Sequence, residues 1–157
     1  PVLAAIILTD CSTKQLVVEQ LAQDPGPHPI IGDWFRLTLA YNPYAALSLS
    51  FGSAAASRIL FSAAAITALL ILLRLYHTTD PGGRLRAAAI ALVAGGAFGN
   101  LLDRIRSARG VVDFIDVGVG DARFYTFNVA DVGVTVGAVL LAIVLWREDR
   151  FAREDRA

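Results

Sequence analysis

The sequence is poor in the residues that cross-link small domains or bind metals in them. Cys11 is the only cysteine among 157 residues, which excludes an internal disulfide and a cluster of thiolate ligands. The two histidines, His28 and His77, fall in separate predicted loops, so we expect neither a histidine metal pair nor a histidine-based triad. Methionine is absent even at residue 1, from which we expect that further N-terminal residues precede this sequence.

The chain also lacks an excess of charge of either sign. Its formal net charge is zero and it has no basic tract, so we expect no nucleic-acid partner. Hydrophobic residues make up 55% of the chain, whereas apolar residues are about 45–50% of a typical soluble domain. These residues gather in blocks, which indicates that lipid is part of the solvent.

Four apolar blocks predict four transmembrane helices, at about residues 2–21, 59–75, 85–102 and 129–146. A spanning helix needs roughly 20 mostly apolar residues, with about 17 as the lower end. The first and third blocks carry polar residues, and the other two are almost purely apolar. The predicted fold class is therefore an all-α membrane protein, with residues 1–157 as one integral membrane domain.

Two long connections follow the first and third blocks, so in a four-span topology they lie on the same side of the membrane. Each contains a segment rich in β-branched or aromatic residues, at 30–39 and 111–117. We expect a small β-sheet element there. A slight excess of arginine on the other side predicts that both termini are cytoplasmic and that the sheet lies at the outer face.

Ionisable residues inside a predicted span are costly and therefore informative. Asp10 and Lys14 are four residues apart, so they share one helix face and can pair. The pair either forms a salt bridge whose only role is to let the helix insert into the membrane, or it also helps to shape a site.

A second pattern occurs twice at the predicted sheet side. Asn100 precedes Asp103 by three residues at the end of the third block, and Asn128 precedes Asp131 by three at the start of the fourth. Helix capping would explain the second pair, and an ion pair of Asp103 with Arg104 would explain the first. Capping does not explain why four acids gather at one interface; these are Asp103, Asp113, Asp116 and Asp131. Gly95 and Gly99 allow close helix packing beside them.

These stretches resemble the motifs of the lipoprotein signal peptidase (signal peptidase II) family. The matching segments are residues 95–104 (GGAFGNLLDR), 110–114 (GVVDF) and 127–131 (FNVAD), together with Asp10 and Lys14 in the first span. The resemblance covers the whole four-span layout. The family usually carries Arg-Asn-x-Gly-Ala-Ala-Phe after the first span. Residues 41–47 here read YNPYAAL, which keeps the asparagine as Asn42 but loses the arginine, the glycine and the phenylalanine, so we expect an altered conformation of this loop.

The resemblance implies an aspartic endopeptidase of the bacterial cytoplasmic (inner) membrane, with its active site near the outer, periplasmic face. It implies that Asp113 and Asp131 are the catalytic pair, supported by Asp10, Lys14, Asn42, Asn100, Asp103, Arg104 and Asn128. The implied substrate is a prolipoprotein with a diacylglyceryl cysteine, cut just before that cysteine. Membrane lipid is the other implied partner, with no metal and no organic cofactor, and we expect a monomer.

Three other functions are compatible with the same residues. A serine–lysine peptidase would use Lys14 as base and Ser12 or a loop serine as nucleophile, although two residues apart on a helix these side chains diverge. A proton- or ion-coupled carrier would use the aspartates as relays, but the chain has no evident internal repeat. A metal-dependent enzyme would bind its ion through Asp113, Asp116 and Asp121.

Overall fold

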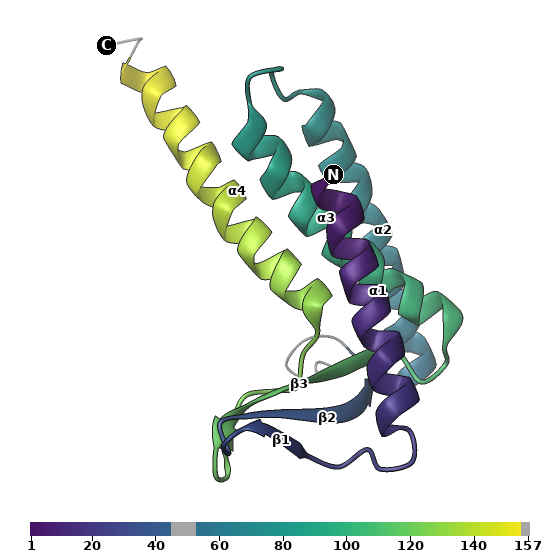
Figure 1. The fold of residues 1–157 in the computed structure, drawn as a ribbon. Coiled ribbons are helices and arrows are strands. Elements are labelled where there is room, and N and C mark those ends of the chain that lie inside the picture. Colours follow the sequence, from purple (N-terminus) through teal and green to yellow (C-terminus); the bar gives the residue numbers. More distant parts are fainter. Residues whose placement is uncertain (45–52, 155–157) are drawn as a thin grey trace.

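The computed structural model describes residues 1–44 and 53–154 and contains four helices and four strands (Figure 1). In chain order they are α1 (Val2–Leu21), β1 (His28–Ile31), β2 (Phe35–Asn42), α2 (Ala54–His77), α3 (Arg84–Arg106), β3 (Val111–Val119), β4 (Ala122–Arg123) and α4 (Val129–Glu154). The predicted helical blocks are confirmed as helices, and α2, α3 and α4 extend beyond the predicted bounds.

Helix α3 is the centre of the arrangement, because it packs against α1, α2 and α4. The sheet lies at one end of the helices, whereas the α2–α3 turn and the C-terminus lie at the other (Figure 1). Both long connections therefore lie at the same end, as predicted. One cluster of buried side chains, around Leu72, Ile90 and Ala94, joins α2 to α3. A second, around Val17, Leu39 and Phe114, joins α1 to the sheet.

In the described part of the chain, three helices are long and apolar enough to cross a membrane: α2, α3 and α4. Helix α1 has 20 residues but is not among them. It carries Asp10, Lys14 and Glu19, and these charged residues interrupt its apolar surface. Three of the four predicted spans thus have the length and composition of membrane helices, and the first remains a prediction.

The four strands form one antiparallel sheet in the order β1-β2-β3-β4. The single strand predicted over residues 30–39 is wrong in its bounds, because the chain turns there. Gly32 adopts a positive φ of 53°, which favours glycine, and the turn ends β1 at Ile31. The strand predicted over residues 111–117 is confirmed as β3.

A bulge in β2 determines which side chain faces Asp113. Leu37 pairs with Ile115, but the next pairing joins Ala40 to Asp113, so β2 contains one extra residue. Since side chains alternate along a strand, this shift places Asn42 on the same face as Asp113, where an unbulged strand would place Tyr41. The bulge thereby selects a polar partner for Asp113.

Asp116 lies on the opposite face of β3 and belongs to a separate ionic cluster. Its carboxylate accepts hydrogen bonds from Arg123 Nε at 2.5 Å, Thr38 Oγ1 at 2.9 Å and Arg36 Nε at 3.1 Å. Burial raises the pKa of Asp116, but these three hydrogen bonds outweigh it and hold the pKa below its usual value. Asp116 of β3 therefore links its strand to β2 and β4 through these hydrogen bonds.

Glycines bring the helices of the sheet end together. A Cβ atom at Gly96 would collide with the backbone oxygen of Ala130 in α4. A Cβ atom at Gly99 would lie 2.5 Å from the Asp10 carboxylate in α1, and one at Gly95 would lie 3.1 Å from Ile6 Cβ. The predicted close packing at Gly95 and Gly99 is confirmed, and Gly96, with Gly137 on the facing helix, allows the close approach of α3 and α4.

We predict that Gly96→Ala destabilises the protein by about 1–3 kcal/mol, the usual cost of overpacking, because backbone cannot move aside as a flexible side chain can. Thermal unfolding in detergent would measure the loss. Gly82→Ala is the matched control, since a Cβ atom there meets nothing within 4 Å. Equal melting temperatures for the two variants would contradict the packing argument.

Candidate active site

Asp113 is a buried carboxyl on β3, 4% exposed, held by two side-chain amides. Asn128 Nδ2 donates to its Oδ1 at 2.6 Å, and Asn42 Nδ2 donates to its Oδ2 at 3.1 Å. Asn42 is itself oriented, because its Oδ1 accepts the backbone N–H of Tyr44 at 3.0 Å. Burial, and then the negative charge of Asp131, raise the pKa of Asp113 to about 6 despite the opposing amide bonds.

Asp131 lies in the first turn of α4 and is fixed by reciprocal capping. Its backbone N–H donates to Asn128 Oδ1 at 3.0 Å, and the Asn128 backbone N–H donates back to Asp131 Oδ2 at 3.1 Å. Capping therefore does explain part of the Asn128–Asp131 pattern. The same Asn128 side chain also binds Asp113, so one fully buried residue contacts both carboxyls.

Asn100 connects this pair to a buried ammonium. Its Nδ2 donates to Asp131 Oδ1 at 2.8 Å, while its Oδ1 accepts from Lys14 Nζ at 2.9 Å and from Asn128 Nδ2 at 3.1 Å. Lys14 Nζ also lies 2.8 Å from Asp10 Oδ2 and 2.9 Å from Asp103 Oδ2. The ammonium thus has three acceptors, which equals its number of N–H donors.

Asp10 and Asp103 extend the network into the scaffold. Asp10 is fully buried, and its second oxygen accepts the backbone N–H of Ala130 in α4 at 2.9 Å. Asp103 accepts the backbone N–H of Val112 in β3 at 3.2 Å. Each acid therefore joins Lys14 to an element that carries one of the two carboxyls, Asp131 on α4 or Asp113 on β3. The Asp10–Lys14 pair both satisfies its own charges and shapes the site.

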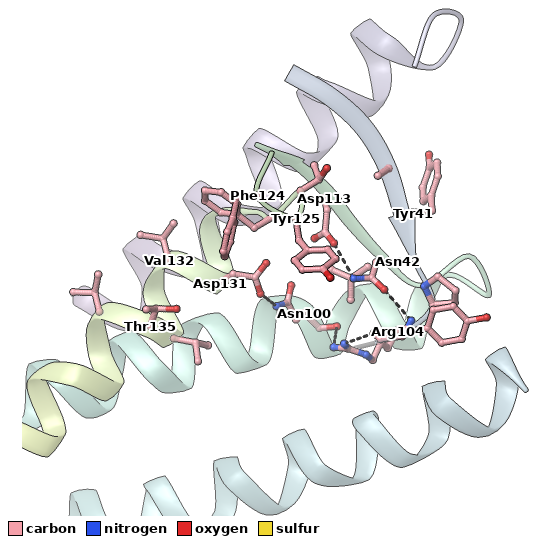
Figure 2. A pocket seen from close by; sticks show the side chains of 18 residues that line it. Tyr41, Asn42, Asn100, Arg104, Asp113, Phe124, Tyr125, Asp131, Val132 and Thr135 are labelled. Atoms are coloured by element: carbon pink, nitrogen blue, oxygen red, sulfur yellow. Dashed lines mark hydrogen bonds between the residues drawn. The ribbon is translucent and has the colours of Figure 1, made fainter. Parts of the chain in front are cut away.

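Asp113 and Asp131, which we call the acid pair, face a cavity of about 720 Å³ (Figure 2). Asn42, Asn100 and Arg104 also line it. Arg104 donates to the backbone oxygens of Asn100 at 3.2 Å and Tyr44 at 3.1 Å, which ties α3 to the end of β2. The other lining residues are Ala40, Tyr41, Pro43, Tyr44, Val111, Phe124, Tyr125, Thr126, Phe127, Val132, Val134, Thr135 and Val136.

The nine residues singled out from the sequence thus form one connected site. Five of them line the cavity, and Asp10, Lys14, Asp103 and Asn128 lie behind it in the hydrogen-bond network. Sequence reasoning missed the aromatic residues Phe124 and Tyr125 and the valine wall of α4. The aromatic run at 124–127 was the available signal, although a loop aromatic alone does not reveal that it faces a cavity.

The altered loop at residues 41–47 is described only in part. Tyr41 carries the guanidinium of Arg109 over its ring at 3.9 Å, and Asn42 keeps its place beside Asp113. Ala45, Ala46 and Leu47 lie outside the described residues. The part of this element that reaches the acid pair therefore retains its polar contact.

The geometry disfavours two of the other functions. Ser12 is exposed, whereas Lys14 is buried and fully occupied by three acceptors, so Lys14 is not positioned as a base for that serine. Asp116 is engaged by two arginines on the opposite face of the sheet from Asp113, which separates two of the three aspartates that the metal-dependent alternative would use. Within residues 1–44 and 53–154, no three His, Cys, Asp or Glu side chains are grouped as metal ligands.

Comparisons with known proteins agree on one family. The sequence model of the family described as signal peptidase (SPase) II matches residues 2–147. A lipoprotein signal peptidase of Ectopseudomonas mendocina is 40% identical over 150 residues, covering 95% of this chain and 88% of the relative. One of Halothermothrix orenii is 36% identical over 149 residues, covering 95% of each.

Two solved structures, each described as a bacterial membrane enzyme, share the fold. The first has a TM-score of 0.81 and 26% identity, and the match covers 94% of this chain and 87% of that one. The second has a TM-score of 0.76 and 27% identity, covering 92% and 89%.

We predict that Asp10 and Lys14 are strongly coupled. Removing one partner of a buried ion pair costs about 3–5 kcal/mol where the other charge is left unpaired; that holds for Asp10 after loss of Lys14, whereas after loss of Asp10 the ammonium keeps Asp103 and the cost should be smaller. Asp10→Asn and Lys14→Met should therefore each lower the free energy of unfolding, and the double variant should lose less than the sum. The control is the exposed pair Arg150–Glu154, which has the same spacing and a distance of 2.9 Å. Its coupling should be about 0.5 kcal/mol or less, and equal coupling in both pairs would contradict the prediction.

Proposed function

Because the chain belongs to the signal peptidase II family, we propose that it is an intramembrane aspartic endopeptidase. It removes the signal peptide from a prolipoprotein by cleaving just before the diacylglyceryl cysteine. The observation that carries this proposal is the acid pair: two carboxyls from separate elements, Asp113 on β3 and Asp131 on α4, at one cavity. The site draws on α1, β2, β3, α3 and α4, which supports treating residues 1–157 as a single peptidase domain.

The acid pair has the electrostatics of general acid–base catalysis. Two neighbouring carboxyls in a poorly solvated site do not both ionise readily, so they hold one proton between them. The raised pKa of Asp113 supports Asp113 as the protonated member and Asp131 as the ionised one. Asp131 then accepts a proton from the water that attacks the scissile carbonyl, and Asp113 donates its proton to the developing oxyanion. As the C–N bond breaks, Asp131 passes the proton it took from water to the leaving amine, and Asp113 recovers a proton from the intermediate's hydroxyl as the new carboxyl group forms.

The polar residues around the pair supply orientation. Asn128 and Asn42 hold Asp113, and Asn100 holds Asp131, so neither carboxyl is free to rotate away from the cavity. Fixed dipoles of this kind lower the barrier because they need no reorganisation as charge develops. Arg104 supplies a cation at the cavity wall.

The cavity wall suits an apolar peptide that arrives from the membrane. Val132, Val134 and Val136 of α4 line the cavity, and so do Tyr41 at the end of β2 and Phe124 and Tyr125 after β4. A signal peptide is rich in apolar residues close to its cleavage site. This division between an apolar helix wall and a polar end supports a substrate whose apolar segment lies along α4 while its scissile bond reaches the acid pair.

The membrane arrangement we propose has four spans, with α1 as the first. Asp10 and Lys14 neutralise each other inside the protein, which removes the main obstacle to placing α1 in lipid. The slight arginine excess at the end away from the sheet favours cytoplasmic termini. The acid pair then lies near the periplasmic face of the bacterial inner membrane, and the protein acts as a monomer without a metal or organic cofactor.

We predict that Asp113→Asn or Asp131→Asn removes nearly all turnover of a lipidated precursor by the purified protein. The amide is close to isosteric, but it cannot act as the base or hold the shared proton. Since the pair acts as a unit, the double variant should be little worse than either single variant. Asp121→Asn is the matched control, because Asp121 is exposed and does not line the cavity.

Binding of the precursor and the melting temperature should stay close to the parent in both variants. Near-parental cleavage by either would refute the assignment of the acid pair. EDTA should leave the parent's rate unchanged, and a loss of rate that a divalent ion restores would favour the metal-dependent enzyme instead.

The pH profile provides a separate prediction. If Asp113 must hold the proton, kcat/KM of the parent should fall on the alkaline side as pH rises through about 6. The Asn42 hydrogen bond favours ionised Asp113 and lowers its pKa, so Asn42→Leu should raise that pKa and move the alkaline limb to higher pH. Charged groups that interact with Asp113 from other elements are Lys14, Arg104 and Asp131, and all stay in place. An unmoved limb in this variant, with only the rate reduced, would contradict the role of Asp113 as the acid.

A further inference from the structure

Arg104 borders two cavities. On one side it lines the cavity of the acid pair, together with Asn100 and Asp113. On the other it lines a second hollow of about 440 Å³ between α2 and α3. In Figure 2 Arg104 lies between the acid pair and α2. The second hollow, which we call the α2–α3 groove, therefore adjoins the proposed active site, and Arg104 lies at the border of the two.

The wall of the groove is apolar along most of its length. Its α2 residues follow the i, i+4, i+8 spacing of one helix face, with the small residues Ser62 and Ala63 between Ile59 and Ile66. Ile105 of α3 forms the facing wall, and the three isoleucines are exposed. Because α2 and α3 both have the length and composition of membrane spans, the groove opens towards lipid.

The polar groups of the groove gather at the sheet end. Arg58 lies near the start of α2, and Arg104 lies near the end of α3, so both guanidinium groups mark the end that also carries the acid pair. Ile66 is about two helical turns further from that end. The groove therefore has a hydrogen-bond-donating head and an apolar tail, which matches a glycerol ester with its acyl chain.

We propose that the α2–α3 groove binds an acyl chain of the lipid on the substrate's cysteine, with its ester oxygens towards Arg58 and Arg104. This inference rests on the proposed function. A whole signal helix is about 10–12 Å across with its side chains, so we assign it to the larger cavity of about 720 Å³ and a single acyl chain to the smaller groove of about 440 Å³. The apolar signal segment then lies along α4, and the lipid leaves the cavity on the side of α2.

The groove contributes mainly by positioning the substrate, and hydrophobic burial adds little to its affinity for the acyl chain. The acyl chain is already surrounded by hydrocarbon before it binds, so entering the groove brings contacts and hydrogen bonds but removes little surface from water. Its effect is to hold the lipidated cysteine so that the preceding carbonyl reaches the acid pair, which is a gain in orientation. The groove thus selects substrates by the presence and length of the acyl chain.

The test fills the groove. Ala63→Trp places a large ring between Ile59 and Ile66, and Ala64→Trp is the matched control, since Ala64 is the next exposed residue on α2 and does not line the groove. Each protein cleaves two synthetic precursors with the same peptide, whose cysteine carries a diacylglyceryl group with either palmitoyl or butyryl chains. Ala63→Trp should lower kcat/KM for the palmitoyl precursor by about tenfold or more while leaving the butyryl precursor within about twofold. Ala64→Trp should resemble the parent on both.

Two results would overturn the inference. One is parental cleavage of both precursors by Ala63→Trp, and the other is an equal loss on both at an unchanged melting temperature, because neither depends on chain length. If Ala63→Trp lowers the melting temperature, the smaller Ser62→Leu provides the same comparison. Failure of the parent to cleave either precursor would instead refute the proposed function itself. If excess phospholipid makes the parent and Ala63→Trp cleave the palmitoyl precursor equally well, then bulk lipid competes with the substrate's acyl chain for the groove.

Discussion

The structure depends on one buried ammonium group. Lys14 Nζ lies within 2.9 Å of Asp10, Asn100 and Asp103, and no donor remains for water. A charge is tolerated inside a protein only when it is paired and hydrogen-bonded, and here both conditions are met by acceptors from α1 and α3. Through Asp10 the ammonium also reaches the first turn of α4, and through Asp103 it reaches β3. One side chain therefore holds in register the elements that carry the proposed catalytic pair.

The same ammonium determines the direction of the hydrogen bonds in the site. An ammonium only donates, so the oxygen of the Asn100 amide must face Lys14, which leaves its NH₂ for Asp131. The Asn128 amide is oriented in the same sense, because its oxygen accepts the Asp131 backbone N–H. Its NH₂ is then left for Asp113. Both carboxyls therefore receive hydrogen bonds from amide NH₂ groups. The orientation of each amide is fixed because the Lys14 ammonium and the Asp131 backbone N–H can only donate.

The sequence predicted the helices, and named the polar residues that the fold brings together at the cavity, better than it predicted the geometry that joins them. The helices and the Asp10–Lys14 pair can be predicted from the spacing of residues along the chain. Close helix packing can be predicted from the small residues Gly95 and Gly99. The β2 bulge was not predictable, since one extra residue between Leu37 and Ala40 leaves no mark in composition, yet it decides that Asn42 faces Asp113. The separation of Asp116 from Asp113 depends on strand register and on Arg36 and Arg123, which lie far apart in sequence. The α2–α3 groove likewise depends on how two helices pack, because the spacing of its α2 residues does not reveal that Arg104 and Ile105 of α3 face them.

A nearby cation lowers the pKa of a carboxyl group, so a carboxyl that must stay protonated needs the positive charges around it to be balanced. Lys14 favours ionised Asp113, but its effect on the Asp113 pKa is smaller than those of burial, Asp131 and the two asparagines. Asp10 and Asp103 both lie against the ammonium, so the three groups together present no net positive charge to Asp113. Were both acids replaced by neutral residues, the uncompensated ammonium would lower the Asp113 pKa and favour release of the proton that the proposed mechanism needs. The two acids behind the site therefore hold the elements together and also keep the acid pair in its working protonation state.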